Sequence, residues 1–157
     1  MATAHFRQTL EIRAQPAAVH ALLTDLDQLR VLHPLIESVR ELPPRAEQPD
    51  ARRYRVVDQL RLGPLRLRTA YTAELRAISE TEIEGRAWQS PAIALHTIYR
   101  LAASALGTRL TESTELRAPW LLRSLVRRQA EAAHRGMLEH LKVQLESPQT
   151  GARRLPK

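Results

Sequence analysis

The order in which periodic segments follow one another constrains the fold of this chain more than any other feature. A strand pattern and a short helical pattern come first, six further strand patterns follow, and one long amphipathic stretch closes the chain. Strand residues alternate between two faces, whereas a helix repeats its apolar positions every three or four residues. The order therefore predicts a curved antiparallel sheet wrapped against a single long helix, with a space between them.

The N-terminal segments show this change of period. His5–Arg13 alternates apolar and polar residues, which predicts a half-buried strand. Pro16 then begins a helix whose apolar residues recur at positions 19, 22, 23 and 26. A second short helix is predicted over Gln28–Leu32.

Six more strands are predicted from alternation and from the turns that bound them. Their ranges are Leu35–Leu42, Arg53–Leu62, Leu65–Ala77, Thr81–Trp88, Ala92–Ala102 and Thr108–Arg117. The proline-rich stretch 43–50 is the clearest loop. The strand over Leu65–Ala77 separates an apolar face from a mostly polar one, which favours an antiparallel sheet with one wet face. Gly85 predicts a bulge or a sharp bend in its strand.

The closing stretch Pro119–Glu146 is predicted to be one helix, about 40 Å long at ~1.5 Å per residue. Its apolar stripe comprises Leu121, Leu122, Leu125, Val126, Gln129, Ala132, Ala133, Met137, Leu141 and Leu145. Gly136 lies inside it at a cost of ~1 kcal/mol against alanine. This glycine either makes room for a ligand under the helix or allows close packing on the sheet. Residues 147–157 lack periodicity, so we expect one domain over 1–146 and a disordered tail.

Composition excludes several classes of protein. The chain has 157 residues and no cysteine, which excludes disulfides and thiolate chemistry. It shows no signal-peptide pattern and no apolar run long enough to span a membrane, so we expect a cytoplasmic location. The net charge is +7, nearly all from arginine. This charge indicates either a nucleic-acid or acidic-lipid partner or a solvated arginine-rich surface, and we favour the latter.

Local sequence adds a resemblance to a known family. The segments concerned are Phe6…Leu10-Glu11-Ile12, Pro16…Leu22-Leu23-Thr24-Asp25-Leu26-Asp27, His33-Pro34 and Gly107-Thr108-Arg109-Leu110-Thr111-Glu112. Over about residues 6–145 the chain resembles the polyketide cyclase/dehydrase and lipid-transport group of the START/Bet v 1-like (SRPBCC) superfamily. The resemblance implies an α+β helix-grip fold with six to seven antiparallel strands around the C-terminal helix. It also implies a deep cavity for a hydrophobic or amphipathic ligand, in a group where proven enzymes are a minority.

His33 departs from that family pattern. Many members carry a large aromatic residue just before the proline of the second helix, and this chain has His33 there. The departure removes one bulky group near the expected mouth of the cavity.

Polar residues on the inward face of the predicted sheet are the candidate ligand-binding residues, with Met137 from the helix. They are Tyr54, Asp58, Thr69, Tyr71, Thr97, Tyr99, Glu112 and Thr114. A few polar groups among apolar walls are typical of a small-molecule pocket. The alternative is that the tyrosines and threonines are ordinary strand formers with satisfied hydroxyls.

Glu112 is the candidate with the sharpest chemical consequence. Burial without a partner would raise the pKa of its carboxyl and allow acid–base catalysis. Burial with an arginine or several hydrogen-bond donors would make Glu112 structural or ligand-orienting, and we expect this second outcome.

Motifs for other chemistry are absent from the sequence. No GxGxxG, Walker A, GxSxG or HExxH pattern occurs, and no two histidines have the spacing of a helical metal site. We therefore expect no metal and no other cofactor. His134 could hydrogen-bond a ligand if it leans toward the sheet, or it could lie on the surface.

These observations predict a protein that binds a lipid- or polyketide-like small molecule. One alternative is a cyclase or dehydratase that acts through Tyr71, Tyr99 and Glu112. A second alternative is a basic interaction module that contacts RNA or a ribosome. An enzyme requires a polar pair that converges in the cavity, whereas an RNA-binding module requires its arginines to gather on one face.

Overall fold

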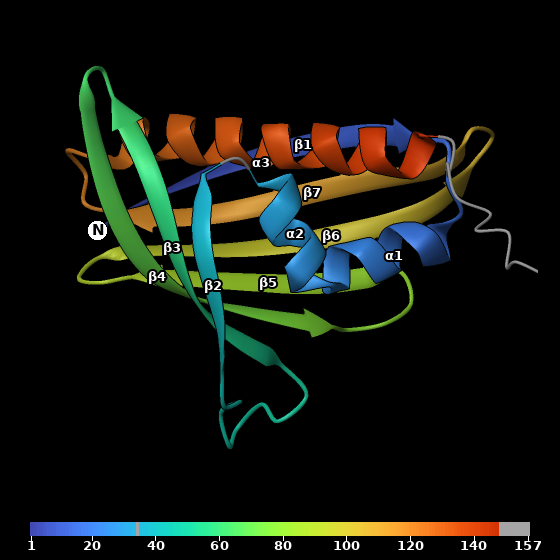
Figure 1. Ribbon diagram of the computed structural model, residues 1–157, viewed down its shortest axis with the longest axis horizontal. Helices are drawn as coiled ribbons and strands as arrows, with labels where there is room; N and C mark the ends of the chain where they lie inside the picture. Colours follow the sequence, from blue (N-terminus) through green and yellow to red (C-terminus); the bar gives the residue numbers. More distant parts are fainter. Residues whose placement is uncertain (34, 148–157) are drawn as a thin grey trace, which may run out of the picture.

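The computed structural model describes residues 1–33 and 35–147, so most of the expected tail lies outside the described residues. The elements are β1 (Ala2–Ile12), α1 (Pro16–Thr24), α2 (Leu26–Leu32), β2 (Ile36–Leu42), β3 (Arg52–Leu62), β4 (Leu65–Ala77), β5 (Glu82–Gln89), β6 (Ile93–Ser104), β7 (Gly107–Ala118) and α3 (Arg123–Glu146). Every predicted strand and helix is present among them, with ends that differ by a few residues (Figure 1).

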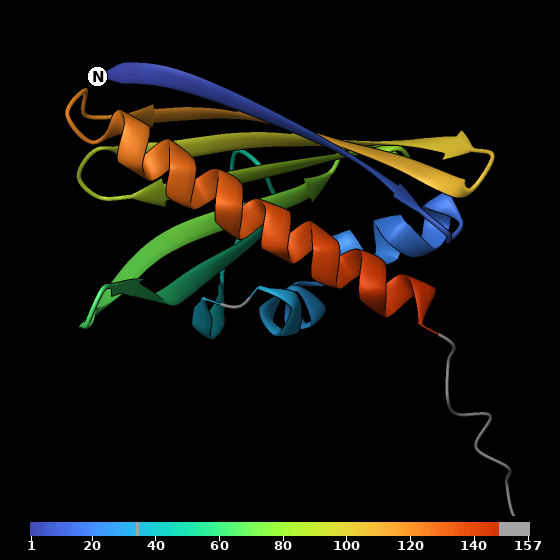
Figure 2. The same cartoon turned by 90° about the horizontal axis from the view of Figure 1, so that it is seen from above.

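The strands form one seven-stranded antiparallel sheet in the order β1-β7-β6-β5-β4-β3-β2. Each strand from β2 to β6 pairs with the next along the chain, and β1 pairs with β7 to form the far edge. The long helix α3 crosses one face of the curved sheet obliquely, while α1 and α2 cover one end (Figure 2). The predicted α+β helix-grip architecture is therefore confirmed.

The long helix begins later than predicted. Residues 120–122 form a turn, in which the backbone N–H groups of Leu122 and Arg123 both donate to the carbonyl of Pro119. No side chain caps the first helical turn. The helix then runs without a break to Glu146. Apolar residues at the start of the predicted stripe, such as Leu121 and Leu125, are exposed, because burial on this face becomes complete only from Met137 onward.

Two glycine predictions change with the structure. The register of β5 with both neighbouring strands is unbroken, so β5 has no bulge at Gly85, and an irregularity occurs in β2 instead. The sharp bend, which was the other expectation for Gly85, stays a prediction. A Cβ atom on Gly85 would lie 3.9 Å from side-chain atoms of Leu75, Thr97 and Tyr99, which is ordinary contact. A Cβ on Gly136 would meet nothing within 4 Å, so close packing does not explain this residue.

The hydrophobic core occupies one end of the space between sheet and helix. Met137, Leu138 and Leu141 of α3 pack there against β1, β7 and α1. The preceding half of α3 carries alanine and polar side chains, among them Gln129 and Ala133, and these fill less volume. The same change of side-chain size along one helix places the core at one end and leaves a cavity at the other.

Candidate functional site

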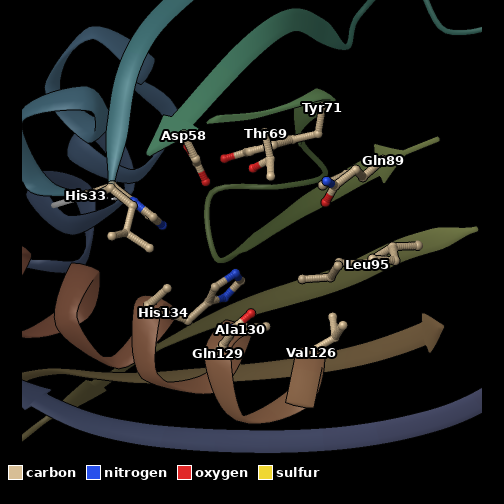
Figure 3. Close-up of a pocket in the computed structure, with 14 residues that line it drawn as sticks. His33, Asp58, Thr69, Tyr71, Gln89, Leu95, Val126, Gln129, Ala130 and His134 are labelled. Atoms are coloured by element: carbon tan, nitrogen blue, oxygen red, sulfur yellow. Dashed lines mark hydrogen bonds between the residues drawn. The ribbon is translucent and has the colours of Figure 1, made fainter. Parts of the chain in front are cut away.

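A cavity of about 150 Å³ lies between the first half of α3 and the sheet (Figure 3). Its lining comprises His33, Leu35, Asp58, Thr69, Tyr71, Ala87, Gln89, Ile93, Leu95, Val126, Gln129, Ala130, Ala133 and His134. Ala130 and Ala133 face this space from α3, where larger side chains would close it. Apolar walls with a few polar groups are typical of small-molecule sites.

A second compartment of about 130 Å³ adjoins the first and shares His33, Tyr71, Ala87, Leu95 and His134 with it. It extends toward the core and ends against Tyr99 and Met137. Gly85 also lines this compartment, where any side chain would reduce the volume. An apolar protein cavity of about 150 Å³ is large enough for benzene. The two compartments therefore suit a ligand with one or two rings or a short acyl segment.

Glu112 and His134 form a buried pair beside the cavity. The Glu112 side chain is 0% exposed, and its cross-strand neighbours are Gln8 of β1 and Tyr99 of β6. The Glu112 carboxylate accepts hydrogen bonds from Gln8 Nε2 at 3.2 Å, from the Tyr99 hydroxyl and from His134 Nδ1. Several donors therefore hold the carboxylate, and the ring that pairs with it belongs to a histidine, whereas an arginine was the expected partner.

This pair also fixes the orientation of the His134 ring. An ionised carboxylate only accepts hydrogen bonds, so Nδ1 of His134 carries the proton and a neutral ring keeps Nε2 as an acceptor. The Phe6 ring meets the imidazole edge-on, with 5.6 Å between ring centroids and an angle of 88°. Burial, together with the Glu112 charge, raises the pKa of the Tyr99 hydroxyl well above its ordinary value. Tyr99 therefore remains a neutral hydrogen-bond donor.

Asp58 and Tyr71 form a second polar pair in the wall opposite α3 (Figure 3). Asp58 is 9% exposed, and burial raises the pKa of its carboxyl to about 6 despite a hydrogen bond from Tyr71. The second carboxylate oxygen, Oδ1, has no hydrogen-bond partner in the described part of the chain. Burial raises the pKa of Tyr71 as well. Asp58 thus offers an unused buried acceptor at the wall of the cavity.

His33 completes the polar lining. Burial lowers the pKa of its imidazole to about 4, with a further contribution from His134. The ring is therefore neutral near pH 7. The backbone N–H of Leu35 approaches His33 Nδ1 at 3.4 Å, which assigns the ring proton to Nε2. His33 can therefore donate a hydrogen bond where His134 can accept one.

The structure separates the predicted site residues into two groups. Those that line the cavity are Asp58, Thr69, Tyr71, Thr97, Tyr99 and Met137. Tyr54, Glu112 and Thr114 line neither compartment. Tyr54 belongs to the hydrophobic core, and Thr114 shares a hydrogen bond of 2.9 Å with the Thr97 hydroxyl. Glu112 contacts the cavity indirectly, through the lining residues His134 and Tyr99.

Four polar residues that line the first compartment are missing from the predicted site, namely His33, Gln89, Gln129 and His134. Two of them carry a signal in the sequence. His134 precedes Met137 by three residues and follows Ala130 by four, which places it on the inward face of the helix. Gln129 is the one polar member of the apolar stripe. His33 and Gln89 follow or end elements, and no periodicity indicates where their side chains point.

Comparison with known proteins identifies the family. The sequence matches the family model for polyketide cyclase/dehydrase and lipid transport over residues 3–146. The chain belongs to this family. No curated protein sequence matches this family member.

Solved structures show the same fold at low sequence identity. An aromatase/cyclase from Streptomyces sp. R1128 superposes with a TM-score of 0.69 at 14% identity, covering 93% of this chain and 98% of the other. A protein from Thermus thermophilus superposes with a TM-score of 0.71 at 17% identity, covering 92% of this chain and 97% of the other. The di-domain aromatase/cyclase of the steffimycin pathway superposes with a TM-score of 0.75 at 12% identity, covering 92% of this chain. This family member spans about half of that two-domain protein, 51%.

Two absences within the described residues bear on partners. No helix there has the length and apolar character needed to cross a membrane. No group of three or more histidine, aspartate or glutamate side chains within the same residues is arranged to hold a metal ion.

Proposed function

We propose that this member of the polyketide cyclase/dehydrase and lipid-transport family binds a small hydrophobic or amphipathic molecule in the cavity under α3. The supporting observation is the two-compartment cavity itself, with apolar walls from β5, β6 and α3 and with polar groups gathered at His33, Asp58 and His134. Apolar walls supply affinity through burial, whereas a few polar groups orient the ligand.

The polar groups indicate what the ligand carries. Asp58 Oδ1 and His134 Nε2 are acceptors, and His33 Nε2 is a donor. A ligand with hydroxyl and carbonyl oxygens attached to an apolar ring or chain would satisfy both kinds of group. An unmatched buried polar group costs about 1–3 kcal/mol, so a pure hydrocarbon is expected to bind less well.

Filling the cavity tests the binding proposal. Ala133→Leu inserts a larger side chain into the cavity, whereas Ala132→Leu makes the same change on the exposed face of the same helix. We expect Ala133→Leu to reduce binding of anilinonaphthalene sulfonate, or of any molecule that co-purifies in native mass spectrometry, by at least about tenfold. Ala132→Leu should leave that binding unchanged. Equal binding by the two variants would contradict the proposed location.

A second candidate function is supported by the convergence of two polar pairs. His134, which Glu112 of β7 holds, approaches the cavity from α3, and the Asp58–Tyr71 pair approaches it from β3 and β4. His134 Nε2 could accept a proton from a carbon next to a carbonyl, while Asp58, when protonated, donates a hydrogen bond to the carbonyl oxygen. This arrangement would suit cyclisation or dehydration of a polyketide-like substrate.

Glu112→Gln separates the two functions. In a carrier the substitution should lower the free energy of unfolding by about 1–3 kcal/mol, because the neutral amide cannot accept from all three donors. It should remove no turnover, and urea unfolding with ligand titration would measure both effects. If a polyketide-like substrate is turned over by the unmodified chain but not by folded Glu112→Gln, the carrier function is wrong and the enzyme is favoured.

A further inference from the structure

Six large apolar side chains are exposed in two segments at one end of the molecule. Leu65 and Leu67 lie at the start of β4, and the others lie in the turn before α3 or in its first turn. We call this set the apolar rim: Leu65, Leu67, Trp120, Leu121, Leu122 and Leu125. Trp120 and Leu121 are 72% and 73% exposed. Figures 1 and 2 both place the β3–β4 hairpin and the beginning of α3 at the same end, away from α1.

The apolar rim continues the lining of the cavity outward on both sides. On β4, alternation puts Leu65 and Leu67 on the face of Thr69, which lines the cavity. Leu122, the residue just before α3, precedes the lining residue Val126 by one helical turn. The exposed apolar surface therefore borders the cavity rather than lying at a random place on the molecule. Exposed apolar patches of this kind mark interaction sites.

Positive charge gathers in the same two segments. Residues 59–73 contain three arginines and no carboxylate, and residues 116–130 contain four arginines and no carboxylate. These seven charges equal the net charge of +7, so the rest of the chain is neutral overall. Three of these arginines form ion pairs. Arg66, Arg123 and Arg128 have no ion-pair partner within the described residues.

We propose that the apolar rim and its arginines dock the protein on an anionic lipid surface, with the cavity beside the bilayer. Tryptophan and leucine insert at the boundary between headgroups and acyl chains, and arginine is attracted to anionic headgroups. The two apolar segments lie on separate elements on opposite sides of the cavity. A fluid surface accommodates any spacing between them, whereas a protein partner would need two matching apolar pockets. This inference does not depend on which ligand the cavity holds.

Vesicle flotation of the whole chain tests the proposal. The vesicles are phosphatidylcholine alone, or equal parts of phosphatidylcholine and phosphatidylglycerol. We expect binding to the anionic vesicles and much weaker binding to the neutral ones. In a Trp88→Phe background, which leaves Trp120 as the only tryptophan, fluorescence emission should shift to the blue on binding.

Variants at the apolar rim have matched controls at the other end of the chain's longest helix. Leu121→Ser should weaken vesicle binding by about tenfold, since burial of a leucine is lost. Arg128→Ala should weaken it by about fivefold. Val143→Ser changes an exposed apolar residue near the end of α3, and Arg13→Ala removes an arginine where β1 ends. Both controls should bind vesicles as the unmodified chain does.

Three results would overturn the lipid surface as occupant. One is the absence of binding to anionic vesicles by the unmodified chain. Another is an equal loss of vesicle binding in Leu121→Ser and in the Val143→Ser control, because binding would then not depend on the apolar rim. The last is binding to soluble polyglutamate as tight as to vesicles, which would favour an acidic protein partner.

Discussion

At the scale of single residues, the cavity holds ionisable groups at some expense of stability. Asp58 has its pKa raised from 3.8 to about 6, and His33 has its pKa lowered from 6.5 to about 4, both chiefly through burial. Between pH 3.8 and about pH 6 the folded chain retains a proton on Asp58 that the unfolded chain releases, so the contribution of Asp58 to stability falls as the pH rises. Between about pH 4 and pH 6.5 the unfolded chain binds a proton on His33 that the folded chain does not, so the contribution of His33 to stability rises with pH. The two effects oppose each other between about pH 4 and pH 6.

Asp58→Asn is expected to remove one of these opposing effects. The variant should be more stable than the unmodified chain at pH 7 by up to about 3 kcal/mol, since a shift of one pKa unit corresponds to about 1.4 kcal/mol. That advantage should fade as pH falls toward 3.8, where the unfolded chain also begins to hold a proton on Asp58. Urea unfolding across this pH range measures the difference. Glu47→Gln, at an exposed position, is the control, and an identical pH profile for both variants would contradict the assignment.

At the scale of elements, α3 is one helix with two different halves. Its second half completes the core through Leu138 and Leu141, and its first half leaves the cavity open with Ala130 and Ala133. A Cβ on Gly136, between these halves, has no neighbour within 4 Å. Nothing in the packing of the described residues therefore requires glycine at this position.

Gly136→Ala should raise the free energy of unfolding by about 1 kcal/mol, because alanine has the higher helix propensity and no contact opposes it. Gly107→Ala is the matched contrast. Gly107 has φ +140°, and a Cβ there would lie 2.6 Å from the carbonyl oxygen of Ile12. The Gly107→Ala variant should have a free energy of unfolding that is lower by more than about 1 kcal/mol. Thermal or urea unfolding would show it, and destabilisation by Gly136→Ala would indicate an unrecognised contact.

At the scale of the whole molecule, core, cavity and charge follow one axis. The core lies toward the C-terminal end of α3, the cavity lies under its first half, and the apolar rim with its arginines lies at and beyond its N-terminal end. Buried apolar packing is therefore concentrated away from the end that holds the cavity and the apolar rim. Elements with fewer buried contacts open more readily, so hydrogen exchange should be fastest in the β3–β4 hairpin and the first turn of α3.

The sequence by itself determined the architecture and the inward face of the strands. Period-two alternation is local, so it predicted every strand and placed Asp58, Tyr71 and Tyr99 on the correct side of the sheet. The family resemblance was confirmed for the same reason, since core and turn positions carry it. Alternation cannot tell how deep an inward side chain lies, and Tyr54 and Thr114 were therefore grouped with residues that line the cavity.

Only the tertiary structure decided which polar groups meet. Glu112, Gln8 and Tyr99 are far apart in the chain and become neighbours through strand register, while His134 reaches them from the helix above. That contact depends on the angle and the height of α3 over the sheet, which no local pattern encodes. The apolar stripe likewise predicted burial along all of α3, whereas its first residues are exposed, because the position of α3 over the sheet decides which part of the stripe is covered.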